Sequence, residues 1–138
     1  MLHPGRTLLE KLLRVNTHAA GGDDRDNALR IGRQMYDIWA LRGDERVIAF
    51  LTDRRQTSTT LGNCYEISKM FRPASPQPSG GFAESPAFDL GSDLANRLSD
   101  AHDLAMSDFY YGTASPPGFG QIVQRIRSHA SLLAIDKP

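Results

Sequence analysis

The chain has 138 residues, with 16 basic and 16 acidic side chains and a formal net charge of zero. A hydrophobic fraction of 40% is too high for a fully disordered chain, and the single cysteine excludes an internal disulfide and a cysteine zinc cluster. No apolar run approaches the roughly 20 residues of a membrane-spanning helix, and the first residues lack the pattern of a signal peptide. We therefore expect one soluble, cytoplasmic domain over residues 1–138, with no membrane partner.

The first half of the chain, about residues 7–72, has the periodicity of amphipathic helices. Thr7 and Glu10 have capping-box spacing, which predicts that the first helix begins at Thr7. Apolar side chains then follow one arc as far as residue 18, at about 100° per residue. By the same periodicity, and with Asp44 as a candidate N-cap, three further helices are expected over residues 25–41, 44–54 and 59–71.

Residues 73–92 interrupt the helical pattern with prolines among serines and glycines. We interpret this stretch as a long exposed Pro/Ser/Gly-rich loop that joins two helical parts of one domain, because neither part alone has enough residues for a stable core. Helical periodicity returns over about residues 93–109 and 119–134. The predicted fold is therefore all-α, with five to six helices in two parts, about residues 7–72 and 93–134.

Polar residues on the first two predicted helices are candidates for chemistry. Lys11 lies at the edge of the leucine arc, where a lysine usually lays its methylenes on apolar surface and keeps its ammonium in water. Arg33 and Asp37 are one turn apart and are compatible with a simple surface ion pair. A functional site requires Lys11 to converge with Arg33 and Asp37, so that a lysine steadies phosphate charge beside an acidic group. The spacing alone leaves both interpretations open.

Signatures of a metal site or a nucleophile are missing from the sequence. No two histidines have metal-ligand spacing, and Cys64 is expected to be a small buried hydrophobe. Gly91-Ser92, followed by Asp100 and Asp103, superficially matches the Gly-Ser … Asp-x-Asp site of nucleotidyltransferases. In that site two carboxylates on a strand bind magnesium, whereas these are three residues apart in a predicted helix. We therefore predict no metal site within this chain.

Three segments together carry a resemblance to a known family. The first is RTLLEK at residues 6–11, and the second is RQMYDI at residues 33–38. The third, about residues 98–126, is a predicted helix that ends in aromatic residues, a turn with proline and phenylalanine, and a final helix. In this order the segments resemble the Arg-Thr-x-x-Glu-Lys, Arg-x-x-Tyr-Asp-Leu and closing patterns of AbiEii/MenT-type nucleotidyltransferase toxins, and the resemblance covers nearly the whole chain.

The resemblance implies roles for five residues. Lys11 would steady the phosphates of a nucleoside triphosphate (NTP), and Asp37 would complete the catalytic site as an acidic or base-like group. Arg6, Arg33 and Tyr36 would be nucleotide-binding or supporting positions. Family members transfer nucleotides from an NTP, with Mg²⁺, to RNA such as the tRNA acceptor end, and a cognate antitoxin restrains them. The NTP, Mg²⁺, tRNA and antitoxin are implied by the resemblance alone, and no cofactor is predicted for the isolated chain.

The chain departs from the family in one respect. The family's Gly-Ser … Asp-x-Asp site lies N-terminal to the Arg-Thr-x-x-Glu-Lys segment and is missing here. One lysine cannot replace the metal and the cationic groups that meet the charge of phosphoryl-type transfer. We therefore expect a truncated C-terminal portion of such a transferase, inactive alone and partnered by an N-terminal nucleotidyltransferase half. Two alternatives stay open: a non-catalytic helical protein-interaction module, and independent RNA binding by the more basic first half.

Overall fold

The computed structural model describes residues 3–19, 28–70, 74–109, 118–128 and 130–135. Within these residues the chain forms six α-helices and three short 3₁₀-helices and no strand, which confirms the all-α prediction. None of the described helices is long and apolar enough to span a bilayer. The α-helices are α1 (Pro4–Ala19), α2 (Ala28–Arg42), α3 (Glu45–Thr52), α4 (Arg54–Ser68), α5 (Asp93–Phe109) and α6 (Phe119–Ser128); the 3₁₀-helices are η1 (Phe82–Glu84), η2 (Pro86–Phe88) and η3 (Ala130–Leu133).

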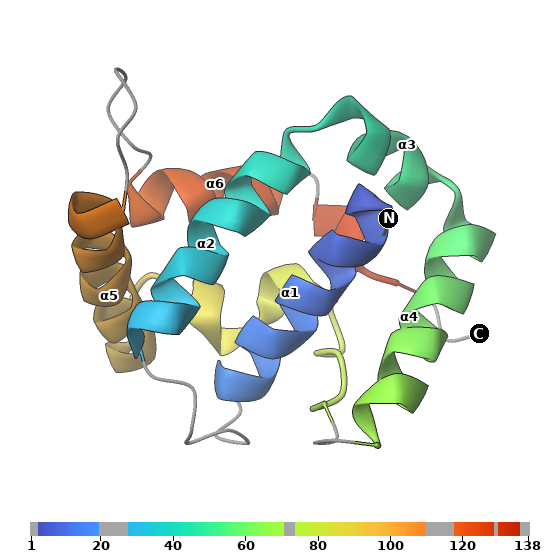
Figure 1. The fold of residues 1–138 in the computed structure, drawn as a ribbon, viewed down its shortest axis with the longest axis horizontal. Coiled ribbons are helices and arrows are strands. Elements are labelled where there is room, and N and C mark those ends of the chain that lie inside the picture. Colours follow the sequence, from blue (N-terminus) through green and yellow to red (C-terminus); the bar gives the residue numbers. More distant parts are fainter. Residues whose placement is uncertain (1–2, 20–27, 71–73, 110–117, 129, 136–138) are drawn as a thin grey trace.

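Helix α2 occupies the middle of the arrangement (Figure 1). It packs along α5 and α1, and it also contacts α3 and α6. Helix α1 in turn contacts α3 and α4, and α4 and α5 lie at opposite ends of the molecule (Figure 1). The contact between α1 and α2 is therefore central in the fold. Between them, these two helices contact each of the other four α-helices.

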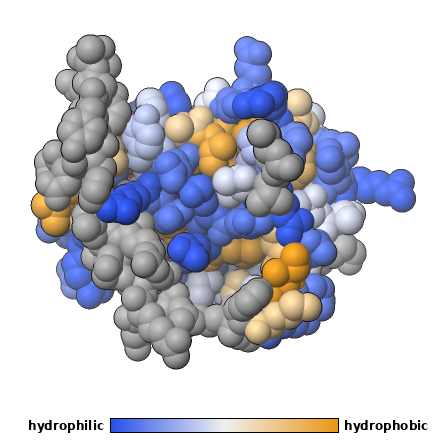
Figure 2. Space-filling model, in the orientation of Figure 1, coloured by the Kyte–Doolittle hydropathy of each residue, from blue (hydrophilic) through white to orange (hydrophobic). Residues whose placement is uncertain are grey.

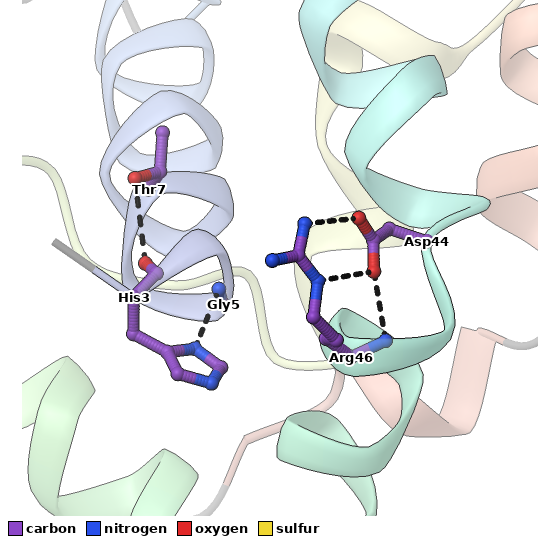
Figure 3. A network of polar contacts seen from close by, with 5 residues as sticks. All are labelled: His3, Gly5, Thr7, Asp44 and Arg46. Carbon is purple, nitrogen blue, oxygen red and sulfur yellow. Dashed lines mark hydrogen bonds and ion pairs between the residues drawn. The ribbon is translucent and has the colours of Figure 1, made fainter. Parts of the chain in front are cut away.

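Helix α1 begins at Pro4 instead of Thr7. The Nδ1 atom of His3 accepts a hydrogen bond from the backbone N–H of Gly5 at 3.0 Å and so caps the helix (Figure 3). Pro4 takes the first helical position, where the missing N–H of a proline is tolerated. Thr7 lies inside the first turn and donates from its Oγ1 to the carbonyl of His3 at 3.4 Å. The predicted capping box is therefore wrong, because an earlier residue already provides the cap.

An aspartate side chain caps the start of α3 and another caps the start of α4. The Asp44 carboxylate caps α3, as predicted. The Asp53 carboxylate accepts the backbone N–H of Gln56 at 3.1 Å, so α4 begins at Arg54 instead of residue 59. The residues around Asp53 also continue the periodicity of the preceding helix, and the prediction therefore assigned them to that helix.

The segment between α4 and α5 contributes to the core. It was predicted to be an exposed loop, but η1 and η2 bury Phe82 and Phe88, which are 0% and 1% exposed. The prediction of exposure is wrong for these residues, because prolines and glycines exclude a long helix without excluding burial. Both phenylalanines belong to one apolar cluster with the buried leucines of α1 and the buried isoleucines of α6. The core thus draws on both helical parts of the chain.

Candidate functional site

Lys11 and Asp37 form an ion pair between α1 and α2. The Nζ atom of Lys11 lies 2.9 Å from Oδ2 of Asp37, across 26 residues of sequence. The side chain of Lys11 is 23% exposed and that of Asp37 is 44% exposed, so the pair lies at the solvent edge of the contact between the helices. The convergence that a functional site requires therefore exists between these two residues.

Gln34 is a third member of the cluster. Its Oε1 accepts a second hydrogen bond from Nζ of Lys11, at 3.0 Å. Gln34 and Asp37 are three residues apart on α2, and residues at this spacing are neighbours on one face of a helix. Sequence reasoning missed Gln34, because it occupies a variable position of the Arg-x-x-Tyr-Asp-Leu pattern. The only signal for it was its spacing from Asp37.

Buried neighbours orient the two helices toward this cluster. Leu8 and Leu12 on α1 are 0% and 1% exposed, and Met35 and Ile38 on α2 are fully buried. Since these side chains are fixed in the core, the polar residues between them are held at its margin. Hydrophilic side chains predominate over the surface that α1 and α2 form (Figure 2). The same geometry also fits the simpler interpretation of Lys11 as a half-buried lysine with its ammonium at the surface.

Arg6 lies on the other flank of α1. Its Nε is 2.9 Å from Oε1 of Glu10, and its Nη1 donates to Oδ1 of Asn63 on α4 at 2.8 Å. Arg6 and Lys11 are five residues apart, which corresponds to about 140° around an α-helix. These contacts direct Arg6 toward α4 and Lys11 toward α2, so the structure does not bring Arg6 to the ion pair.

Tyr36 and Arg33 share α2 with Asp37 but have different surroundings. The ring of Tyr36 packs against Trp39, with centroids 5.9 Å apart, and the guanidinium of Arg125 on α6 lies 4.1 Å over the Trp39 ring. Tyr36 thus packs against Trp39, which in turn lies against the guanidinium of Arg125 on α6. Arg33 is exposed on the turn before Asp37. Of the supporting residues that the resemblance implies, Arg33 lies on the same face of α2 as the carboxylate.

Cys64 is buried on α4, as the sequence predicts. Burial raises the pKa of its thiol; the nearby Arg6 acts in the opposite direction, and Glu10 raises it further. A raised pKa leaves little thiolate at neutral pH, and the thiolate is the nucleophilic form of cysteine. The environment of Cys64 therefore suits packing and not nucleophilic catalysis.

Metal-ligating side chains do not cluster in the part of the chain that the structure describes. Mg²⁺ takes oxygen ligands in near-octahedral geometry. In the part of the chain that the structure describes, no group of three or more His, Cys, Asp or Glu side chains could hold a metal ion. Asp37 provides one carboxylate at the cluster, and its Oδ2 is engaged by the Lys11 ammonium. The donor set fits a phosphate oxygen at Lys11 better than a metal at Asp37.

Comparisons with known proteins leave the family assignment as a prediction. Neither protein-family models, nor curated proteins, nor solved structures give a significant match to this chain. The resemblance therefore depends on the three sequence segments alone.

Proposed function

We propose that this chain supplies the lysine and aspartate portion of a cytoplasmic nucleotidyltransferase that adds nucleotides from an NTP to the acceptor end of tRNA. The observation that carries the proposal is the 2.9 Å contact between Lys11 and Asp37. These are the two residues to which the resemblance gives catalytic roles, and they come from separate segments of the sequence. Lys11 would bind triphosphate oxygens, and Asp37 would hold the ammonium and complete the site as its acidic group.

The rest of the site would come from another stretch of polypeptide. The Gly-Ser … Asp-x-Asp motif, which this sequence does not contain, would supply the carboxylates that bind Mg²⁺. The chain would then act only together with an N-terminal nucleotidyltransferase half, and a cognate antitoxin would restrain the assembled enzyme. Without the antitoxin, the assembled enzyme would inhibit growth.

Reassembly of the enzyme tests this proposal. The full chain is mixed with an N-terminal half that carries the Gly-Ser … Asp-x-Asp motif, and transfer of radiolabelled NTP to tRNA is measured. We expect transfer only in the mixture, and we expect Lys11→Ala and Asp37→Ala each to lower it by about 100-fold or more. Lys69→Ala is the matched control, because Lys69, the residue after α4, forms an exposed ion pair with Glu66 at 3.0 Å. Transfer by the chain alone, or undiminished transfer by both variants, would contradict the proposal.

A helical interaction module is the second candidate. Ile67 and Met70, at the C-terminal end of α4, are 40% and 80% exposed, and adjacent exposed apolar side chains favour association. This candidate expects the chain to self-associate with rising concentration in analytical ultracentrifugation. Met70→Ser would abolish that association and Lys11→Ala would leave it intact. A chain that stays monomeric at all concentrations would contradict this expectation.

A further inference from the structure

We propose that Gln34 is a positioning residue for Lys11, an inference that rests on the proposed function. A lysine ammonium has three N–H donors. Within the described residues, one donates to Oε1 of Gln34 at 3.0 Å and one to Oδ2 of Asp37 at 2.9 Å. The third N–H is the one that binds a phosphate oxygen of the NTP. Gln34 and Asp37 together thus determine the direction in which this donor points.

Two acceptors fix the orientation of the Lys11 ammonium, which a single acceptor cannot do. The four-carbon stem of a lysine is flexible, so a single acceptor fixes the distance to the ammonium without fixing its orientation. Gln34 and Asp37 lie on successive turns of α2, and they hold the ammonium of Lys11 from two positions. The side chain of Lys11 is only 23% exposed, so the contact of α1 with α2 also restricts its stem.

The lack of charge on Gln34 is as important for phosphate binding as its acceptor oxygen. Asp37 balances the charge of Lys11 with one carboxylate, and the amide of Gln34 adds an acceptor without adding charge. A glutamate at this position would keep the acceptor but would give the cluster a net negative charge. Such a cluster repels the phosphates of an NTP, since like charges at close range are unfavourable. The proposal therefore makes different predictions for the loss of the oxygen and for the gain of a charge.

The first experiment detects the ordering of Lys11 directly in the full chain. The sequence has three lysines, Lys11, Lys69 and Lys137, and their Nζ groups give separate signals in a proton–nitrogen correlation spectrum when hydrogen bonds slow their exchange with water. We expect the Lys11 signal to weaken in Gln34→Met and to persist in Gln34→Glu. Lys69, in an exposed pair with Glu66 at 3.0 Å, is the reference for an ammonium that exchanges freely with water. An unchanged Lys11 signal in Gln34→Met would overturn the proposal.

The second experiment uses the reassembled enzyme and separates KM from kcat. We expect Gln34→Met to raise the KM for NTP by about tenfold, the effect of weakening one hydrogen bond to a charged group. Gln34→Glu keeps that hydrogen bond and should raise KM through repulsion of the NTP phosphates, and kcat should change little in both variants. Gln124→Met, on the exposed side of α6, is the matched control. If the wild-type mixture transfers nucleotide and neither Gln34 variant changes KM, the positioning role fails and the proposed function stands. If the wild-type mixture shows no transfer, the proposed function fails, and the spectrum alone decides whether Gln34 orders Lys11.

Discussion

One carboxylate both begins α3 and binds a neighbouring guanidinium. Oδ1 of Asp44 accepts the backbone N–H of Arg46 at 2.8 Å, and Oδ2 lies 2.9 Å from Nη2 of the same arginine (Figure 3). These contacts lower the pKa of Asp44 below its ordinary value of 3.8. The hydrogen bond from the Arg46 side chain is the largest cause and the bond from its backbone is the next, because both favour the ionised carboxylate.

We expect Asp44→Asn to lose the pH-dependent part of the stability that this cap contributes, because asparagine keeps a capping oxygen without the charge. The pKa of Asp44 is lowered in the folded state, so the wild-type advantage in stability is present above the ordinary pKa of 3.8 and is lost as the pH falls through the folded-state pKa. Urea unfolding of both proteins from about pH 2 to about pH 7 measures the difference. A difference in stability that is the same at every pH would contradict this account.

Helices α1 and α3 approach each other closely at Gly5. A Cβ at this position would lie 2.3 Å from Cδ1 and 2.9 Å from Cβ of Phe50. The ring of His3, which caps α1, packs against the same phenylalanine with centroids 5.2 Å apart. Because the contact includes Cβ of Phe50, rotation of its ring cannot relieve a clash, and one of the helices would have to move. The beginning of α1 is thus fixed by its cap and by its packing together.

Gly5→Ala is expected to lower the free energy of unfolding by about 1–3 kcal/mol, the usual effect of overpacking. Gly120→Ala on α6 is the matched control, because nothing lies within 4 Å of a Cβ at that position. Alanine favours helix more than glycine does, so Gly120→Ala should leave stability unchanged or raise it by up to about 1 kcal/mol. Urea unfolding of the two variants provides the comparison. If both substitutions raise stability, helix propensity and not close packing decides the effect at Gly5.

Local patterns account for the part of the fold that could be predicted from the sequence. The leucine arc of α1 and the cap at Asp44 depend on residues within a few positions of each other, and both are confirmed. The start of α4 was missed because Asp53 fits either a helix end or a helix cap. The contact of Lys11 with Asp37 depends on which faces of α1 and α2 meet, and local periodicity does not determine that. Gln34 occupies a variable position of its motif, and its contact with Lys11 is seen only once the helices are assembled.

Hydrogen bonds connect the segment before α5, residues 74–92, to parts of the chain that are distant in sequence. Arg127 on α6 donates to the carbonyl of Phe88 at 2.7 Å. The amide of Gln77 accepts from the N–H of Ile135 at 2.9 Å and donates to its carbonyl at 2.8 Å. With Phe82 fully buried, these contacts make the segment part of the structure that supports α1 and α6. The position of α1 at the candidate site therefore depends on residues that the sequence suggested were peripheral.

We expect Phe82→Ala to lower the free energy of unfolding by about 3–5 kcal/mol, because it leaves a cavity in a closed core. Leu90→Ala is the matched control in the same segment: Leu90 is 51% exposed, and its loss should change stability by no more than about 0.5 kcal/mol. Urea unfolding is followed by far-UV circular dichroism and by fluorescence of Trp39, the single tryptophan, which lies on α2. If one core joins both parts of the chain, the two signals change together in the wild type and shift together in Phe82→Ala. Separate transitions, or equal effects of the two substitutions, would show that the segment is a dispensable connection and that α1 and α2 keep the candidate site without it.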